Sequence, residues 1–256
     1  MGAADAPRAA LAALMAVSIA LRWVRRIVVL AFCAAVALVL FALFRPPPQD
    51  LPWTPLRLDQ PAGLFTGRKI VALGRDASAC RAVLKDAGLR FTAVTPRGPE
   101  ACRVGNSVRI APRQDMLTLT PIVATACPVA AGLLVWQAQV VQPAAQRLLG
   151  TTVARIEHFG SYACRRMYGR SEGNWSEHST GNAIDISAFV LADGRRVSVL
   201  RDWSKGNARG RFLHAVRDGG CPLFATILSP DYNAAHRDHL HLDQADRGDM
   251  GWRACR

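Results

Sequence analysis

The most prominent pattern along the chain is an unbroken apolar run near its start. Residues 27–44, IVVLAFCAAVALVLFALF, contain no charged residue and no strong helix breaker. This length is just enough to cross the hydrocarbon core of a bilayer as a helix. Residues 9–21 are also apolar, but the stretch is too short for a second span. We therefore expect one transmembrane helix at 27–44, preceded by an amphipathic stretch or by a true start at Met15.

Basic residues flank this run unevenly. Residues 22–26, RWVRR, precede it, and residues 45–48, RPPP, follow it. Because basic residues stay on the cytoplasmic side, we expect residues 1–26 in the cytoplasm and everything after the span exported. A cleaved signal peptide is the alternative, since a basic region before an apolar run is also its signature. The run ends in the bulky residues 43–45 instead of small ones, which favours an uncleaved anchor.

Proline and the apolar periodicity divide the rest of the chain. Residues 45–63 carry six prolines, a density that favours polyproline II and predicts a semi-rigid spacer. One domain is then expected over residues 64–256. Helical spacing occurs at 80–88 and at 128–149, where Pro143 predicts a kink or a second helix. Strand-like runs occur at 91–94, 152–159, 223–228 and 239–243, the last of which is predicted to be the final strand.

In the second half of the chain, the sequence also predicts a hairpin turn and the end of a helix. Asp193-Gly194 separates two alternating apolar runs in residues 183–200, which predicts a hairpin with a type I′ turn. Residues 209–218 have helical spacing and are followed by Gly219 and Gly220, which predicts a helix closed by these glycines. The fold class expected is therefore α+β, with a central antiparallel sheet and flanking helices.

Cysteine usage agrees with export. Cys33 lies inside the apolar run, and an even number follow it, namely Cys80, Cys102, Cys127, Cys164, Cys221 and Cys255. Such a set in an oxidising compartment predicts up to three disulfides, with fifteen possible pairings. No Cys-x-x-Cys pair occurs in the sequence, which argues against a four-cysteine zinc knuckle.

The chain is strongly basic, with a formal net charge of +13, and nearly all of this charge is arginine. No lysine-rich run and no nucleic-acid-binding motif accompanies it, so no nucleic-acid partner is expected. A basic surface instead suits an acidic polymer or an anionic membrane face.

Two polar segments carry the candidate chemistry. In residues 176–185, SEHSTGNAID, a histidine and a carboxylate flank a glycine bend, which lets a loop and the following strand present His178 and Asp185 to one point. In residues 236–243, HRDHLHLD, strand alternation places His239, His241 and Asp243 on one face and two leucines on the other. Histidine and carboxylate ligands together favour Zn²⁺ over calcium or magnesium.

These residues resemble known families. Residues 176–185 followed by Asp238-x-x-His241 resemble the zinc D-alanyl-D-alanine metallopeptidases of the LAS superfamily, and His239-x-His241 is similar to penicillin-insensitive murein endopeptidases. GSYACRR, HSTGNAIDI, SVLRDW and PDYNAAHRDHLHLD resemble more closely the bacterial extensin-like C-terminal domain proteins, over roughly residues 75–256. The resemblance implies a LAS/hedgehog-like fold. Together with the apolar run and its basic flank, it predicts a periplasmic domain on a single-pass inner-membrane anchor.

The resemblance also implies a role for each residue. His178, Asp185 and His241 fall on the zinc ligands and leave a fourth position for water. Asp238 falls on the general base, where the D-Ala-D-Ala enzymes usually carry the longer glutamate, and the nearby histidines 239 and 236 are substitute bases. Arg165, with Arg166 as the alternative, falls on the arginine that stabilises a substrate carbonyl or carboxylate, although the family segment usually lacks the cysteine at 164.

The activity that the resemblance implies is hydrolysis of an amide bond in peptidoglycan peptides by a water activated at zinc. Endopeptidase and carboxypeptidase action both stay open at this point. The leading alternative is a non-catalytic module that binds the cell wall or a protein and has kept the peptidase fold, as hedgehog-like relatives illustrate.

Overall fold

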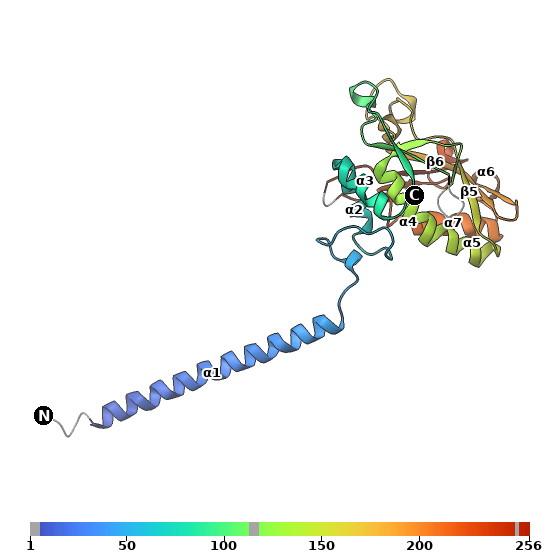
Figure 1. The fold of residues 1–256 in the computed structure, drawn as a ribbon. Helices are drawn as coiled ribbons and strands as arrows, with labels where there is room; N and C mark the ends of the chain where they lie inside the picture. The colour runs from blue at the N-terminus through green and yellow to red at the C-terminus, as the bar shows by residue number, and fades with distance from the viewer. Residues whose placement is uncertain (1–5, 113–117, 249–250) are drawn as a thin grey trace. The chain divides into compact units, whose positions relative to one another are not determined.

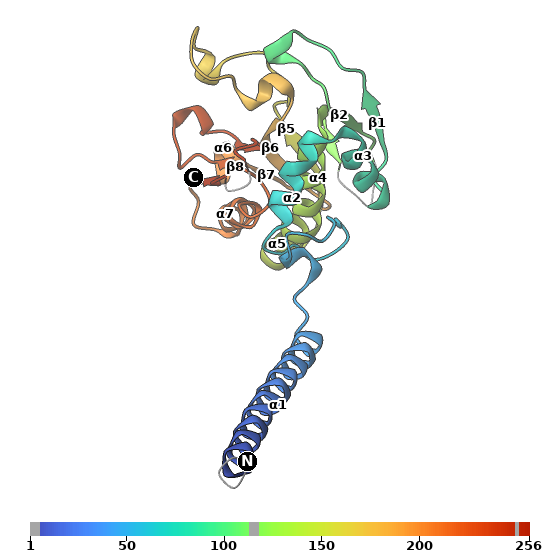
Figure 2. The same ribbon diagram turned by 90° about the vertical axis from the view of Figure 1, so that its left-hand side faces the viewer.

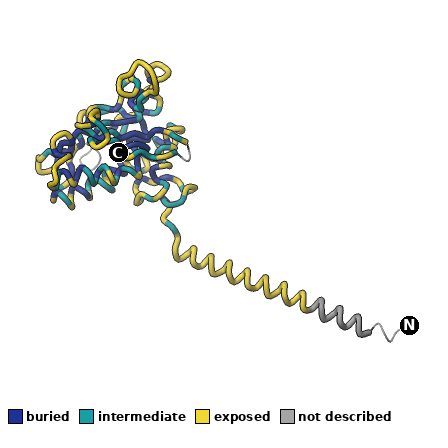
Figure 3. The backbone as a smooth tube through the Cα atoms, turned by 180° about the vertical axis from the view of Figure 1, so that it is seen from behind, coloured by how far each residue is buried: buried dark blue, intermediate teal, exposed yellow. Residues whose placement is uncertain are grey.

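The computed structural model describes residues 6–112, 118–248 and 251–256, with side chains from Ser18 onward. The chain divides into a unit up to Pro47 and a compact unit Pro48–Arg256. The first contains a single long helix, α1 (Ala6–Leu43), whose segment Ser18–Leu43 is long and apolar enough to cross a membrane. The described side chains of this helix are exposed (Figure 3). Both a membrane span and an N-terminal signal sequence have these properties.

Most of the predicted spacer belongs to the folded domain. A short 3-10 helix, η1 (Pro48–Asp50), opens the compact unit, and Leu56 and Leu58 are buried in its core. Gln49 is 1% exposed, and its side-chain amide donates to the Pro55 carbonyl and to Gln60. The prolines stop α1 as expected, but the leucines between them supply apolar surface that is buried. The connection between the two units is therefore only a few residues long.

The domain begins with a small α+β portion. It consists of helices α2 (Thr66–Ala72) and α3 (Ala77–Asp86), joined by η2 (Leu73–Arg75), and of a three-stranded antiparallel sheet. That sheet has the order β1 (Phe91–Val94), β2 (Ser107–Ile110), β4 (Ala124–Ala126). Asp76 begins α3 by accepting hydrogen bonds from the amides of Ser78 and Ala79, which have no partner within the helix.

A larger sheet forms the centre of the domain (Figure 1). Its strands are β3 (Leu119–Thr120), β5 (Val153–His158), β6 (Ala183–Leu191), β7 (Arg196–Ser198), β8 (Thr226–Leu228), β9 (Leu240–Asp243) and β10 (Ala254–Cys255). The order is β10-β8-β9-β6-β5-β3, with β7 paired to β6. The central pairs are antiparallel as predicted, whereas β3 and β10 add to the edges in parallel. The segment 239–243 is thus not the final strand, because β10 follows it.

Helices pack on the sheet and close the core. The pattern at 128–149 gives α4 (Cys127–Trp136), a π-helical turn at Gln137–Val141 and α5 (Gln142–Leu149), with Pro143 in the first turn of α5. Short α6 (Val199–Asp202) and longer α7 (Ala208–Gly220) follow the hairpin. The fully buried Trp136 packs against Phe189 and Phe224, with ring centroids 5.8 and 6.3 Å away. In Figures 1 and 2, α5 and α7 lie at the opposite end of the domain from the segment around residue 170.

The hairpin turn differs from the predicted type I′. That type needs positive φ at both central residues, and in this turn only Gly194 has it, at +84°. The Gly194 amide donates to the Leu191 carbonyl, and the Leu191 amide donates to the Arg195 carbonyl. This is the pattern of a type I turn followed by a left-handed glycine, the common three-residue hairpin connection. Aspartate therefore takes an ordinary conformation, and the glycine alone takes the left-handed one.

The two glycines predicted to close the helix at 209–218 instead lie inside it, since α7 runs to Gly220. Close packing explains both of them. A Cβ at Gly219 would lie 2.4 Å from Val140 Cγ1, and one at Gly220 would lie 2.6 Å from Ile227 Cδ1. Glycine is therefore required by the approach of α7 to its neighbours and does not mark the end of the helix.

Three disulfides staple the domain, which confirms the number expected from the sequence. They join Cys80 to Cys127, Cys102 to Cys164, and Cys221 to Cys255. The first links α3 to α4, the second links η3 (Glu100–Cys102) to the segment that precedes Arg165, and the third links the end of α7 to β10. Cys33 in α1 is free and exposed.

Candidate metal centre

Neighbouring strands β6 and β9 supply two of the predicted ligands. In their antiparallel register, Asp185 lies directly opposite His241. Alternation sends their neighbours to the other face, where four side chains are fully buried, namely Ile184, Ile186, Leu240 and Leu242. The division of residues 236–243 into an apolar face and a polar face, which the sequence predicted, is confirmed. The strand with Asp185 is divided in the same way, and the register brings the two polar faces into contact.

The third residue comes from a short turn before β6. The 3-10 helix η6 (Glu177–Thr180) begins at Ser176, whose hydroxyl accepts from the His178 amide, and ends at Gly181, which has φ of +71°. This left-handed glycine returns the chain into β6, so that His178 and Asp185 meet although they are seven positions apart. The glycine bend predicted to bring them to one point is present.

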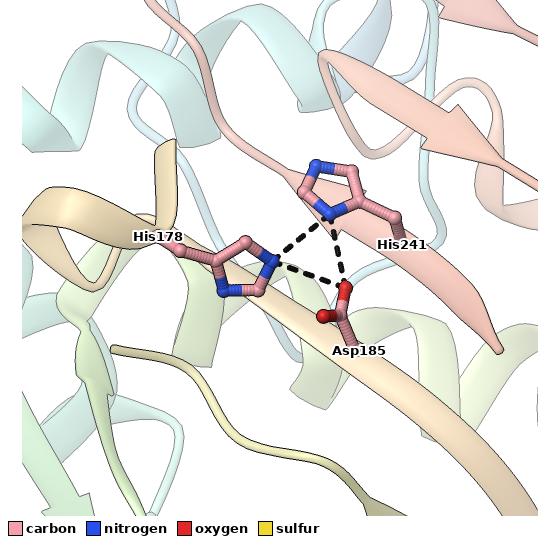
Figure 4. Close-up of side chains that lie close together, drawn as sticks. All are labelled: His178, Asp185 and His241. Atoms are coloured by element: carbon pink, nitrogen blue, oxygen red, sulfur yellow. Dashed lines mark hydrogen bonds and ion pairs between the residues drawn. The ribbon is translucent and has the colours of Figure 1, made fainter. Parts of the chain in front are cut away.

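The three side chains converge on one point (Figure 4). His178 Nε2 lies 3.1 Å from Asp185 Oδ1 and 3.1 Å from His241 Nδ1, and the last two atoms are 3.0 Å apart. Around a tetrahedral zinc with bonds of about 2.0–2.1 Å, ligand atoms lie roughly 3.3 Å from one another. The spacing of the three atoms therefore fits a single zinc ion.

In His178 and His241, one ring nitrogen points away from the centre. The hydrogen-bond partner of that outer nitrogen determines whether the inner nitrogen is an acceptor. His178 Nδ1 lies 2.9 Å from the Ser161 carbonyl, and His241 Nε2 lies 3.1 Å from Asp243 Oδ2, so both nitrogens donate. In the neutral rings, the inner nitrogens then carry lone pairs directed at Asp185. Three lone pairs at this distance repel one another unless a proton or a cation lies between them. In metal-binding histidines, the ring nitrogen that does not face the metal usually donates in the same way to a carboxylate or a carbonyl.

Electrostatics in the centre favour a bound positive charge. Burial lowers the pKa of His241, but hydrogen bonds with Asp185 and Asp243 outweigh it and raise the pKa to about 9. Burial also opposes ionisation of Asp185, yet the hydrogen bonds and charges of the two histidines hold its pKa far below the ordinary value. Without a metal, a proton on His241 satisfies the site near neutral pH. Metal binding therefore has to displace that proton.

His239 and Asp238 form a pair beside the centre. His239 Nε2 lies 3.5 Å from Asp185 Oδ1, whereas its Nδ1 lies 2.8 Å from Asp238 Oδ1. Asp238, the predicted base, is not among the residues that line the adjoining cleft, and His239 is. The carboxylate thus contacts the far side of the imidazole and fixes its Nδ1 as the donor.

A cleft of about 420 Å³ opens onto the centre. Besides the three ligands and His239, it is lined by Arg165, Tyr168 and His236. Arg165 therefore lines the same cleft as the three proposed ligands, whereas its proposed role toward a substrate stays a prediction. Arg166 does not line the cleft, because its guanidinium donates to the Gly173 carbonyl and lies 4.5 Å from the Trp175 ring centre. The disulfide at Cys164 fixes the chain directly before Arg165.

His236 is the second imidazole that could exchange protons in the cleft. Its Nδ1 lies 2.8 Å from Asn233 Oδ1, and its ring is 5.2 Å from that of His239. Burial, followed by the charges of the neighbouring histidines, lowers the pKa of His236 to about 4. The ring is therefore neutral near pH 7.

Two further histidines lie outside the centre. His158 bonds the Pro121 carbonyl, and His214 bonds the Trp203 carbonyl. The Glu177 carboxylate accepts a hydrogen bond from the Asn182 side chain, and burial raises the pKa of its carboxyl group. Sequence reasoning placed Asp243 on the correct face but did not assign it the contact with His241. An acidic residue two positions after a ligand on the same strand was the available indication.

Ser161 was not anticipated at all. It is 1% exposed, its carbonyl accepts from His178, and its hydroxyl bonds Thr125, Gly181 and Ala183. These bonds fix the segment before η6 against β6. A serine in a loop carries no sequence pattern that would predict such a role.

Comparison with known families bears on the whole domain. The family model of the extensin-like protein C-terminus matches residues 78–256. The match covers more than half of the chain, so the chain belongs to this family, and it includes every residue of the metal centre. No curated protein and no solved structure gave a match. The predicted resemblance to extensin-like proteins is thereby confirmed, whereas the predicted relation to zinc peptidases stays a prediction.

Proposed function

We propose that this chain is a zinc-dependent hydrolase that cleaves an amide bond in peptidoglycan peptides. The observation that carries the proposal is the convergence of His178, Asp185 and His241 on one point at the floor of an open cleft. A structural zinc site is normally closed by four protein ligands, whereas a catalytic one keeps a position for water or substrate. Three ligands beside a cleft match the catalytic kind.

The ligand set supports zinc. Two imidazole nitrogens and one carboxylate oxygen suit zinc, while calcium and magnesium prefer oxygen ligands. When bound there, the ion would supply Lewis acidity toward the scissile carbonyl. Asp243 and the Ser161 carbonyl would hold the two imidazoles in the tautomers that the ion needs.

Proton transfer is assigned to His239. Asp238 accepts a hydrogen bond from the Nδ1–H group of His239, so Nε2 of the neutral ring is free to accept a proton from the attacking water. The same atom can then return the proton to the leaving amine. Asp238 becomes a positioning residue, which differs from the role of general base that the resemblance implies.

Arg165 is proposed to bind the substrate. Its side chain lines the cleft together with the ligands, and a guanidinium offers two parallel donors to a carbonyl or carboxylate oxygen. The choice of wall peptides as substrate is supported by the resemblance to D-Ala-D-Ala metallopeptidases. It is also supported by the apolar N-terminal helix, which fits export toward the cell wall.

The test is hydrolysis of purified muropeptides by the zinc-loaded full chain, followed by chromatography. Wild type should release a shorter peptide, and His239→Gln should lower kcat by about 10²–10⁴-fold while keeping its zinc. Asp238→Asn should shift the pH profile of kcat and change KM little. His214→Gln is the matched control, because this histidine lies on α7 and bonds a backbone carbonyl outside the cleft.

Three outcomes would contradict the proposal. A wild-type protein with a full complement of zinc that cleaves no muropeptide would indicate the non-catalytic binding module instead. Hydrolysis that survives in His178→Ala would exclude the metal centre as its source. Equal losses in His239→Gln and His214→Gln would show that the effect of the first variant is not local to the cleft.

A further inference from the structure

A second cavity lies on the domain away from the metal ligands, and it is strongly basic. It has a volume of about 350 Å³ and is walled by Phe65 and Trp252 together with five cationic side chains, namely Arg68, Lys69, Arg75, Arg247 and Arg253. None of the three zinc-site residues lines it. We call this cavity the basic pocket.

Three of these guanidinium groups have no carboxylate partner among the described residues. Arg75 forms a bidentate ion pair with Asp246, but Arg68, Arg247 and Arg253 form no ion pair with any carboxylate in the described part of the chain. Arg253 donates to the Phe224 carbonyl, and Arg247 donates to backbone carbonyls and to a threonine hydroxyl. Burial, and then the charges of Arg68 and Arg247, lowers the pKa of Arg253. The pocket therefore has a positive potential suited to an anion.

The pocket lies where the chain enters the domain. Lys69 Nζ donates to the carbonyl of Pro48, the first residue of the compact unit, at 3.2 Å, and Pro52 also lines the pocket. The apolar helix ends at Leu43, so the residues up to Pro48 span at most about 17 Å even when fully extended. With α1 across a bilayer, this entry point is held within that distance of the membrane surface.

Exposed apolar side chains occur close in sequence to the same entry and to the pocket residues. Trp53 is 76% exposed, Leu64 is 83% exposed and Trp252 is 67% exposed. Trp53 belongs to the segment that follows Pro48, Leu64 precedes the pocket residue Phe65, and Trp252 is itself a pocket residue. Tryptophan beside basic residues is the composition that settles at the headgroup level of a bilayer.

We propose that the basic pocket, with Trp53, Leu64 and Trp252 around it, docks onto the phosphate headgroups of anionic phospholipids next to the point where α1 enters the membrane. The cations attract the headgroups, and the aromatic rings insert beside them. The short tether keeps the local concentration of lipid high, so weak contacts suffice. A wall polymer is the less favoured ligand, because nothing tethers it to this entry point. The proposal does not depend on the catalytic activity of the metal centre.

The test uses the full chain reconstituted in lipid nanodiscs. Hydrogen exchange of peptides that cover α2 and residues 251–256 is measured in phosphatidylglycerol discs and in phosphatidylcholine discs. We expect exchange several-fold slower in the anionic discs, with the difference lost in high salt because screening weakens the attraction. Arg68→Glu should abolish the difference and Arg68→Gln should reduce it. Arg68 is exposed, and its one described side-chain contact is with the Phe65 ring, so both variants should fold.

Controls separate the sources of phosphate. Arg155→Glu makes the same charge change at an exposed position of β5 outside the pocket, and it should keep the full difference between discs. Equal protection in both lipids, or an equal loss in Arg155→Glu, would overturn the proposal. Protection by inorganic phosphate or by soluble muropeptides in phosphatidylcholine discs would assign the pocket to a free anion or to the wall, and would overturn it too.

Discussion

Asp243→Asn tests the metal centre without removing a ligand. The carboxylate is 4% exposed, with Oδ2 placed 3.1 Å from His241 Nε2 and Oδ1 accepting from the Ala245 amide at 3.0 Å. In the variant, one oxygen can keep the backbone bond, but the new NH₂ group then faces the Nε2–H of His241. Two donors would point at each other in a buried site.

The imidazole can escape this conflict by changing tautomer. His241 would then carry its proton on Nδ1, the atom that faces His178 and Asp185, and zinc could bind only after the ring returned to the Nε2–H form that faces the new NH₂ group. Loss of such a supporting carboxylate typically lowers metal affinity by about 10–100-fold. That range corresponds to about 1.4–2.7 kcal/mol of binding free energy. The fold should change little, because the substitution conserves volume.

Zinc affinity is measured by competition with a chromophoric chelator near neutral pH, together with the metal content of the purified chain. His178→Ala, which removes a ligand, sets the scale for loss of the site. Asp246→Asn is the matched control, since it makes the same chemical change three positions along, where the partner is the exposed Arg75. Equal zinc affinity in wild type and Asp243→Asn would refute the tautomer argument. An equal loss in Asp246→Asn would do so as well.

Two further predictions concern stability. The pKa of His236 is about 4 in the fold and about 6.5 in the unfolded chain, so the unfolded state binds more protons between these values. Stability present above pH 6.5 is therefore lost as pH falls toward 4. The free energy of unfolding of metal-free protein is measured in urea at pH 7 and at pH 4.5. Between these pH values, this free energy should fall by about 2 kcal/mol less in His236→Gln than in wild type, and equal decreases would refute the lowered pKa of His236. Gly220→Ala should destabilise the domain, because overpacking against Ile227 costs about 1–3 kcal/mol and exceeds the helix-propensity gain of about 1 kcal/mol. Gly105→Ala, which meets no atom within 4 Å, should be nearly neutral, and similar thermal midpoints for both variants would contradict the packing argument.

The sequence predicted the ligand faces well because strand alternation is a local property. The aliphatic residues beside Asp185 and His241 determine which face of each strand points to the core, and all four of them are fully buried in the structure. The sequence did not predict how the two strands pair. Register and neighbour order depend on contacts across more than fifty residues, so the position of Asp185 opposite His241 could only be seen in the fold.

Long-range packing also explains what the sequence did not predict. The prolines of 45–63 indicated a spacer, yet Leu56 and Leu58 fill the core because the domain offers them an apolar surface. The two glycines near residue 220 resembled a helix end, but they are there for the contacts of α7. The disulfide pairing follows from which elements lie side by side, and the spacing of the cysteines carries no information on that.

We propose that His239, and not Asp238, is the base, and the reason lies in the position of the Asp238 carboxylate. Aspartate is one methylene shorter than the glutamate usual at this position, and its carboxylate meets His239 on the Nδ1 side, away from the ligand atoms. The ring then presents Nε2 to the centre, 3.5 Å from Asp185. A carboxylate held in this way can influence proton transfer only through the basicity and orientation of the imidazole. If His239 is the base, Asp238→Asn and His239→Gln must differ in kind. The first should shift the pH dependence of kcat, and the second should remove the proton acceptor itself.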